Sequence, residues 1–335
     1  MLSMESYCDW PPVSRLPWKT MTQTILAALL PVVFVVALGL LAAKYNIVPK
    51  TSAPVFADFV VRFALPLALL NGVLKTSPSA IENVPYLISM LVGLMIPYAI
   101  GFAIMRWLFH RSLAESALAA LICAFPSMAY SGLPVLEAVV GQQGILAVIV
   151  GNLVTSIVMI PLTLVLVQIG QRGNNTGEGT GALIAKSLLD AVKQPLVWLP
   201  VIGAIVALCG VHTPSLLELS FNLIGQAAAG VALFTLGLLL YGQRLRIDRD
   251  ITVNVLLKDV GQPAAMFVLV TLFGLHGAPG RELFLTGAIP TATAVSMLAL
   301  RYRVYADEAA ASTLVGTLLS VATITVAIVL SARII

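Results

Sequence analysis

Residues 121–127 read LICAFPS and residues 285–291 read LTGAIPT, an offset of 164 positions in a chain of 335 residues. Each stretch places a proline, Pro126 or Pro290, deep inside a long apolar segment. A proline in the interior of a helix removes one backbone hydrogen bond and clashes with the preceding turn, so it breaks or kinks the helix. Two broken helices at corresponding places in two similar halves of a membrane protein are typical of secondary transporters, in which the breaks mark the binding site.

The composition of the chain is that of an integral membrane protein. Apolar residues make up 59% and charged residues 10% of the sequence, and the mean hydropathy is +0.99. These values lie outside the range of soluble domains. The net charge of +4 does not indicate a nucleic-acid partner, because the basic residues are scattered between the apolar segments and form no block. The three cysteines have no CxxC spacing, so nothing indicates a metal or redox site.

Ten apolar segments are long enough to be membrane-spanning helices. They are residues 22–43, 53–74, 85–109, 113–140, 143–170, 194–211, 215–242, 252–275, 280–300 and 307–333. Each is close to or longer than the ~20 residues that a helix needs to cross ~30 Å of hydrocarbon. The offset of 164 relates the fourth segment to the ninth. A second echo, IVGNLVTS at 149–156 and LVGTLLSV at 314–321, relates the fifth segment to the tenth.

The sequence therefore predicts an all-α membrane protein of ten transmembrane helices in two five-helix repeats. The repeats occupy residues 22–170 and 194–335, with a linker at 171–193 and an N-terminal tail at 1–21. Met21 is an alternative start of the chain. The first segment is too long for the apolar core of a signal peptide, so we expect it to remain as a helix.

The linker between the repeats has two parts. It begins with a flexible, glycine-rich stretch, GQRGNNTGEGTG at 170–181. In the following stretch, ALIAKSLLDAVK at 182–193, Lys186, Asp190 and Lys193 fall on one helical face. This pattern predicts a short amphipathic helix on the inner membrane surface, with an ordinary solvated connector as the alternative.

Lysine and arginine are unevenly divided between the two sides of the predicted membrane protein. The loops after helices 1, 3, 5, 7 and 9 hold 12 of them: Lys44, Lys50, Arg106, Arg111, Arg172, Lys186, Lys193, Arg244, Arg246, Arg249, Arg301 and Arg303. The other side holds five: Arg15, Lys19, Lys75, Arg281 and Arg333. The positive-inside rule then puts both termini on the non-cytoplasmic side of the cell's inner (cytoplasmic) membrane. With five helices in each, the two repeats have inverted orientations.

The proline-broken helices 4 and 9 are expected to cross near the middle of the membrane. Pro126 and Pro290 each lie about 10–14 residues into their helices, or ~15–21 Å at 1.5 Å per residue. Backbone groups freed at that depth are tolerated only beside protein or a water-filled cavity. The second half of each helix starts just after its proline and presents free N–H groups and about +0.5 charge, which suits an anion. Two simple packing kinks are the alternative interpretation.

Polar side chains close to the breaks are the predicted substrate ligands. They are Ser127, Tyr130 and Ser131 at the first break, Thr291, Thr293 and Ser296 at the second, and Asn152 and Thr155 on one face of helix 5. Lys258 in helix 8 joins this set, because charges at membrane depth are costly and usually functional.

Three more charged residues within apolar segments are candidates for ion coupling or charge compensation: Asp58, Arg62 and Asp259. Asp58 and Arg62 lie at i and i+4 of helix 2, where a simple helical ion pair is the alternative. Asp58 and Asp259 are each able to take up a proton.

No enzyme motif is present in the sequence. The chain lacks HExxH and CxxC, and its glycine-rich linker lacks the GK[ST] of a P-loop. We therefore expect no catalytic activity, no cofactor, no metal site and no ATP drive within this chain. A channel is the stronger competitor, but no ring-forming filter motif appears, and inverted broken helices favour alternating access.

Three stretches resemble the auxin efflux carrier family, and within it the bacterial branch of malonate carriers. They are FALPLALL in helix 2, AFPSMAYSGLPVL in helix 4 and AIPTATAVSMLALRYRVYADEAAASTLVGTLLSV across helices 9 and 10. The similarity covers nearly all ten helices. Plant members commonly carry an asparagine just after the helix 4 proline, where this chain has Ser127. The ligand contacts are therefore expected to differ at that position.

The resemblance implies a scaffold of helices 1, 2, 6 and 7, a mobile transport domain of helices 3–5 and 8–10, an elevator-type motion and a homodimer. Together with the residues, it predicts a secondary active transporter of a small organic anion in the lipid bilayer. Malonate or a similar carboxylate is the expected substrate, with H⁺ or Na⁺ as the coupling ion. A membrane sensor or channel for a small carboxylate with the same fold is the alternative function.

Overall fold

The computed structural model describes residues 18–74, 84–172, 185–186, 189–190, 192–210, 213–241 and 248–331. Within these residues all regular structure is helical, apart from one isolated β-bridge between Pro126 and Thr291. The prediction of an all-α protein is confirmed for this part of the chain. The predicted N-terminal tail and the predicted linker lie largely outside it.

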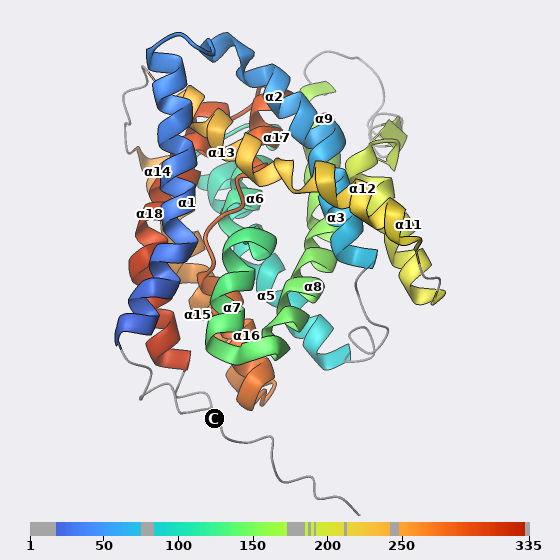
Figure 1. The fold of residues 1–335 in the computed structure, drawn as a ribbon, viewed down its shortest axis with the longest axis vertical. Helices are drawn as coiled ribbons and strands as arrows, with labels where there is room; N and C mark the ends of the chain where they lie inside the picture. Colours follow the sequence, from blue (N-terminus) through green and yellow to red (C-terminus); the bar gives the residue numbers. More distant parts are fainter. Residues whose placement is uncertain are drawn as a thin grey trace, which may run out of the picture.

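The helices follow the apolar segments of the sequence (Figure 1). They are α1 (Trp18–Lys44), α2 (Ala53–Phe59), α3 (Leu65–Leu74), α5 (Val84–Ala103), α6 (Leu113–Ala124), α7 (Leu133–Val140), α8 (Ile145–Val154), α9 (Ile160–Arg172), α11 (Pro195–Leu208), α12 (Ser215–Gly225), α13 (Ala227–Leu240), α14 (Arg249–Leu256), α15 (Gln262–Leu272), α16 (Gly277–Ala288), α17 (Ala294–Tyr302) and α18 (Ala306–Ser331). Single π turns occur at Val60–Ala64, Ile104–Leu108, Met128–Gly132, Thr155–Met159 and Leu257–Gly261. Most of them join two consecutive helices into one longer rod.

Six helical rods in the described residues are long and apolar enough to cross a membrane, judged by length and composition. They are Lys50–Leu74, Val84–Leu108, Leu146–Arg172, Ser215–Leu240, Arg249–Leu272 and Ala306–Ser331. Shorter apolar helices lie at Val33–Lys44, Leu113–Ala124 and Pro195–Leu208. The chain is thus built as a multi-pass membrane protein.

Local sequence signals set where several helices begin. Ser112 and Glu115 form a capping box before α6, in which the Ser112 hydroxyl accepts from the Glu115 amide at 3.2 Å and the Glu115 carboxylate accepts from the Ser112 amide at 2.9 Å. The Asp248 carboxylate accepts from the Ile251 amide at 2.9 Å and caps α14. Pro195 occupies the first position of α11, where its missing N–H costs nothing.

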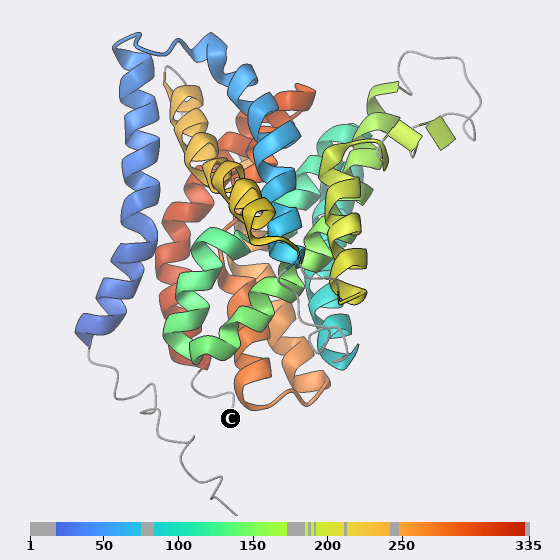
Figure 2. The same cartoon turned by 45° about the vertical axis from the view of Figure 1, so that its right-hand side comes forward.

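The helices form two groups that each draw on both halves of the chain. We call α1–α3 and α11–α13 the framework group, and α5–α9 and α14–α18 the crossover group. In the framework group α1 lies along α13, and α11 lies along α3 (Figures 1 and 2). In the crossover group α5 and α9 pack on α6, while α15 and α18 pack on α16.

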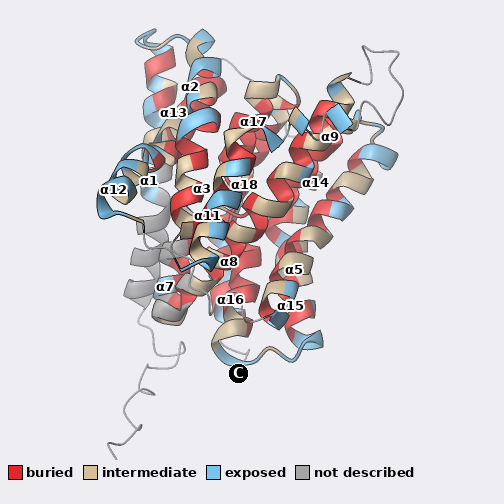
Figure 3. Ribbon diagram, turned by 90° about the vertical axis from the view of Figure 1, so that its right-hand side faces the viewer, coloured by how far each residue is buried: buried red, intermediate tan, exposed pale blue. Residues whose placement is uncertain are grey.

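The centre of the molecule is formed by the crossover group, where residues 116–124 of α6, 282–288 of α16 and 294–299 of α17 are all buried. Figure 3 shows the buried parts of α16 and α17 in red. In α6 every residue from Ser116 to Ala124 is buried, and four of these nine are alanines. Small side chains let neighbouring helices approach closely where apolar lipid cannot drive association. This packing fixes the first half of each broken helix in place.

Glycines bring α1 and α13 into backbone contact. A Cβ atom added at Gly39 would lie 2.0 Å from the carbonyl oxygen of Phe234, and one added at Gly237 would lie 2.1 Å from that of Val36. No real Cβ atom is found so close to a carbonyl oxygen. The two helices can therefore keep this distance only with glycine at both positions.

We predict that Gly237→Ala destabilises the protein, whereas Gly230→Ala on the same helix does not. The first variant forces α1 and α13 apart and should cost about 1–3 kcal/mol, the range for overpacking. The second adds a methyl group with no atom within 4 Å, and alanine is favoured over glycine in a helix by ~1 kcal/mol. Thermal unfolding of the two purified variants in detergent measures the difference. Equal melting temperatures would contradict the backbone contact.

Candidate functional site

The two broken helices meet at a short antiparallel backbone bridge. Helix α6 ends at Ala124, and α16 ends at Ala288. Between them, the Ser127 amide donates to the Pro290 carbonyl at 2.9 Å, and the Ala292 amide donates to the Phe125 carbonyl at 2.9 Å. The two sequence stretches that echo each other at an offset of 164 positions thus lie side by side.

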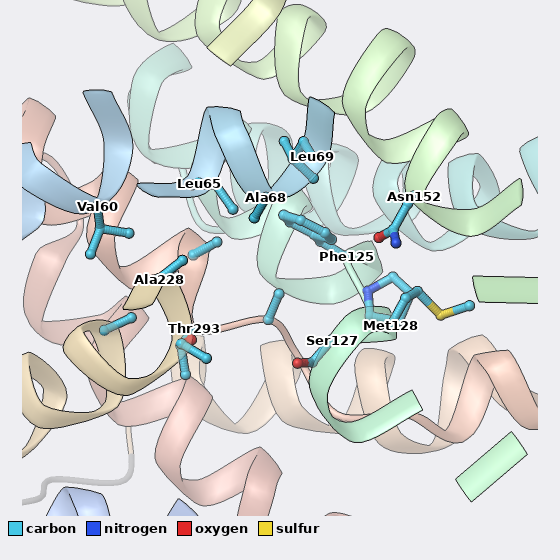
Figure 4. A pocket seen from close by; sticks show the side chains of 15 residues that line it. Val60, Leu65, Ala68, Leu69, Phe125, Ser127, Met128, Asn152, Ala228 and Thr293 are labelled. Atoms are coloured by element: carbon cyan, nitrogen blue, oxygen red, sulfur yellow. The ribbon is translucent and has the colours of Figure 1, made fainter. Parts of the chain in front are cut away.

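A cavity of about 60 Å³ lies beside this bridge. Its polar side chains are Ser127, Asn152 and Thr293 (Figure 4). The other lining residues are Val60, Leu65, Ala68, Leu69, Phe125, Pro126, Met128, Ala228, Ala229, Ala232, Ala292 and Ala294. The cavity therefore offers three hydrogen-bonding side chains within an otherwise apolar wall.

The polar and apolar walls of the cavity come from different groups of helices. The rod Lys50–Leu74 and helix α13, both in the framework group, contribute only valine, leucine and alanine. Ser127, Asn152 and Thr293 all belong to the crossover group. The side chains that could hydrogen-bond a ligand in this cavity thus all come from the crossover group. The framework group would contribute only apolar contacts.

Both second half-helices begin at the cavity. The helical segment Met128–Val140 starts one residue after Ser127, and α17 starts one residue after Thr293. The first turn of a helix leaves N–H groups without intrahelical acceptors, and the helix dipole adds about +0.5 charge at that end. Two such ends directed at one small cavity make it suited to an anion.

Several residues that were predicted from the sequence to be ligands form hydrogen bonds with other protein groups and do not line the cavity. The Thr291 hydroxyl donates to the Ile122 carbonyl at 2.8 Å, near the end of α6. The Thr155 hydroxyl donates to the Asn152 carbonyl at 3.0 Å within its own rod. The Ser296 hydroxyl lies between α17 and α18, bonded to the Thr313 hydroxyl at 2.9 Å and to the Ala309 carbonyl at 3.1 Å. Ser131 is partly buried in the π turn after the break, and the side chain of Tyr130 is outside the described part of the structure.

Lys258, also a predicted ligand, lies at the crossing but is not among the residues that line the cavity. Its ammonium group donates to the Gln262 side-chain oxygen and, at 3.4 Å, to the carbonyl of Gly287. The Gln262 amide in turn donates to the Ala124 carbonyl at 2.9 Å. Lys258 and Gln262 thus bond the carbonyl ends of both first half-helices, which carry the negative end of the helix dipole.

Sequence reasoning missed Gln262, although a signal was present. It lies four residues after Lys258 in an apolar segment, the spacing at which two side chains share a helix face. A buried side-chain amide in that position is expected to need partners of its own.

Asp58 links the two groups of helices. Its carboxylate accepts from Arg62 at 3.3 Å and from Arg301 of α17 at 3.4 Å. The helical ion pair, the alternative interpretation of these two residues, is present in the structure, and Arg301 adds a contact that the spacing could not predict. Asp58 and Arg62 are about half exposed, so each pair contributes a modest free energy, of the order of 0–1 kcal/mol. No group of three metal-ligating side chains occurs in the described residues.

A crossing of two broken helices beside a cavity, within a bundle of apolar helices, is the arrangement of a membrane carrier. The chain belongs to the membrane transport protein family, whose profile matches residues 24–328. This is the auxin efflux carrier family that the sequence resembles, so the predicted family is confirmed.

Individual relatives carry transporter or carrier names. The chain is 29% identical to the uncharacterized transporter YfdV of Escherichia coli (strain K12) over 295 residues, which cover 87% of this chain and 92% of that protein. It is 25% identical over 304 residues to the "Putative malonate transporter" of Rhizobium meliloti (strain 1021), covering 90% and 94%. It is 24% identical over 232 residues to auxin efflux carrier component 5 of Arabidopsis thaliana, covering 59% and 66%.

We predict that cysteines introduced at Ser127 and Thr293 react with a small thiol reagent such as methyl methanethiosulfonate, and that one at Ser296 does not. The first two positions line the cavity, whereas Ser296 is fully buried between helices. The background carries Cys8→Ser and Cys209→Ser, and the buried Cys123 remains. Mass spectrometry of the folded protein measures the labelling. Equal labelling at Ser296 and Ser127 would contradict the geometry.

Proposed function

We propose that the protein is a secondary active transporter of a small organic anion, with malonate or a similar carboxylate as substrate. The observation that carries this proposal is the cavity at the crossing, where two helix N-termini and the side chains of Ser127, Asn152 and Thr293 converge. Each of these groups can donate a hydrogen bond to a carboxylate oxygen. The relative named as a malonate transporter supports the choice of substrate.

The proposed architecture is ten transmembrane helices in two inverted five-helix repeats, residues 22–170 and 194–335. The pairing of helices supports it. The first predicted segment, α1, lies along α13 of the seventh, and the sixth, α11, lies along α3 of the second. Segments 1 and 2 of the first repeat correspond to segments 6 and 7 of the second. Exchanging the two repeats therefore converts the pair 1 and 7 into the pair 6 and 2, as a two-fold relation requires. The proposed location is the inner (cytoplasmic) membrane of the cell, with both termini on the non-cytoplasmic side.

The proposed motion is an elevator-type movement of the crossover group against the framework group. The framework residues that line the cavity carry no polar side chain, so they form no side-chain hydrogen bond that would have to break as the ligand moves past them. All hydrogen-bonding side chains travel with the substrate. A homodimer formed through the framework group would anchor the stationary part in the membrane.

Charge limits how a dianion can be moved. A dianion entering a cell against 100 mV meets about 4.6 kcal/mol of opposing potential. The two helix N-termini together supply about one positive charge. We propose that the Lys258 ammonium, held at the crossing by Gln262 and Gly287, supplies a second charge, so that the dianion is balanced in the site. Co-transported cations would offset the opposing membrane potential.

Uptake of radiolabelled malonate into proteoliposomes tests the proposed function. The proton, sodium and voltage gradients are imposed separately. Saturable uptake that follows one gradient is the expected result. Binding of malonate without saturable flux would instead favour a sensor, and flux that does not saturate would favour a channel.

We predict that Ser127→Ala combined with Thr293→Val weakens malonate binding at least fivefold. Each hydroxyl lost removes a hydrogen bond worth ~0.5–1.5 kcal/mol, and 1.4 kcal/mol is a factor of ten. Ser220→Ala with Thr317→Val is the matched control, because those hydroxyls bond carbonyls of their own helices and line neither cavity. Isothermal titration of the purified variants measures both. Unchanged affinity in the first pair would exclude this binding site.

We predict that Lys258→Met weakens binding of the dianion malonate more than binding of its monoamide, a monoanion of similar size. The substitution keeps an unbranched side chain one atom shorter and removes its charge. A general loss of folding would lower both affinities equally, whereas a lost charge changes their ratio. A ratio that shifts by less than about threefold, ~0.7 kcal/mol, would contradict the role of the lysine.

A further inference from the structure

Asp259 is a buried carboxylate without a hydrogen-bond partner. It is 2% exposed, and neither of its side-chain oxygens has a partner among the described residues. It lies in the π turn Leu257–Gly261, near the middle of the rod Arg249–Leu272. π turns occur frequently at functional sites, and this one directs the adjacent residues Lys258 and Asp259 both into the protein.

The neighbouring lysine forms no ion pair with Asp259 among the described residues. The Lys258 ammonium donates to Gln262 and Gly287, at the crossing of the broken helices. The two adjacent side chains therefore lie in different environments: Lys258 is hydrogen-bonded at the crossing, and Asp259 has no hydrogen-bond partner among the described residues.

Asp259 faces a second and larger cavity, of about 620 Å³. Its other lining residues are Val260, Pro263, Ala264, Phe267, Phe284, Ala322, Thr323, Val326, Ala327 and Leu330. The cavity follows α15 as far as Phe267 and α18 as far as Leu330, one residue before the end of that helix. It therefore leads from the middle of the membrane rod toward the end of the molecule where α18 stops (Figure 1).

The surroundings of Asp259 favour its neutral form. Lys258 is the charged group that acts on it most directly, and its positive charge favours the ionised carboxylate, but its hydrogen bonds go to Gln262 and Gly287. The Cys123 thiol of α6 is also close to Lys258 and donates to the side-chain oxygen of Asn254. Helix α16 brings Phe284 to the cavity, and α18 brings Thr323, whose hydroxyl bonds the Ser320 carbonyl. An ionised carboxylate in such a place would lack the hydrogen bonds that compensate for its burial.

Helix α18 leaves room for the carboxylate. A Cβ atom added at Gly316 would lie 3.6 Å from one oxygen of Asp259 and 3.9 Å from the other. A larger side chain there would fill the space beside the carboxyl group. The glycine thus leaves the carboxyl group without a side chain beside it at this point of α18.

We propose that Asp259 is the proton-binding site of the carrier, and that its proton is transported together with the anion. This inference rests on the proposed transport function. Asp259 takes a proton from water through the larger cavity and is neutral while the crossover group moves. It releases the proton on the other side. In the proposed orientation the end of α18 faces away from the cytoplasm, so protons enter from outside and the pH gradient across the membrane drives import.

The test compares Asp259→Asn with the wild-type protein in proteoliposomes. The variant keeps the shape of the side chain but cannot titrate. We expect the rate of malonate exchange between the two sides to stay within about threefold of the wild type. The accumulation driven by an imposed pH gradient at clamped voltage should fall at least tenfold. Glu137→Gln, an exposed acid on α7, is the matched control and should accumulate malonate normally.

The outcomes separate this inference from the proposed function. Accumulation by Asp259→Asn equal to that of the wild type, or wild-type accumulation indifferent to the pH gradient, would overturn the proton site. Absence of both exchange and uptake in the wild type would instead overturn the transport function.

A second measurement does not depend on folding of the variant. Dicyclohexylcarbodiimide reacts with protonated carboxyl groups in apolar surroundings. Mass spectrometry of the treated wild-type protein is expected to find Asp259 modified, less so as the pH rises, and the half-exposed Asp58 unmodified. No modification of Asp259 at any pH would overturn the proposal.

Discussion

The structure depends on the backbone bridge between the two broken helices. Two hydrogen bonds, Ser127 to Pro290 and Ala292 to Phe125, join the interruptions of segments that lie 164 residues apart in the sequence. Without them, these four backbone groups at the two breaks would lie unpaired within the hydrocarbon, at a cost of several kcal/mol for each group. The bridge satisfies the donors and acceptors of one helix with those of the other, and so fixes where both second halves begin.

The bridge has different surroundings on its two sides. On one side the new helix N-termini and three polar side chains surround the smaller cavity. On the other side Lys258, Gln262 and the hydroxyl of Thr291 bond the carbonyls with which the first halves end. The positive N-terminal ends of the second half-helices thus lie at the cavity. The negative C-terminal ends of the first half-helices accept hydrogen bonds from Lys258, Gln262 and Thr291. This separation suits a carrier whose ligand is an anion.

The sequence predicted the helical architecture and both breaks because these depend on local properties. Apolar length sets the helices, and a proline in mid-segment interrupts them whatever its neighbours are. The selection of side chains that face the cavity was less predictable. A π turn at Met128–Gly132 follows the first break directly and changes which residues share a face. Ser296 lies close to the second break in sequence and Thr155 lies three residues after Asn152 on helix 5, yet both bond other groups. The partners of Lys258 and Asp58, and the contact of Gly39 with Gly237, need the pairing of distant helices, which one sequence does not encode in any local pattern.

The central claim is that the crossing binds an anion between the two second half-helices. Its most direct test is a structure of the protein with bound bromomalonate, located by the anomalous scattering of bromine. The account predicts the bromine in the smaller cavity, with carboxylate oxygens within hydrogen-bonding distance of Ser127 and Thr293. Bromine found only elsewhere, such as in the cavity beside Asp259, would contradict it.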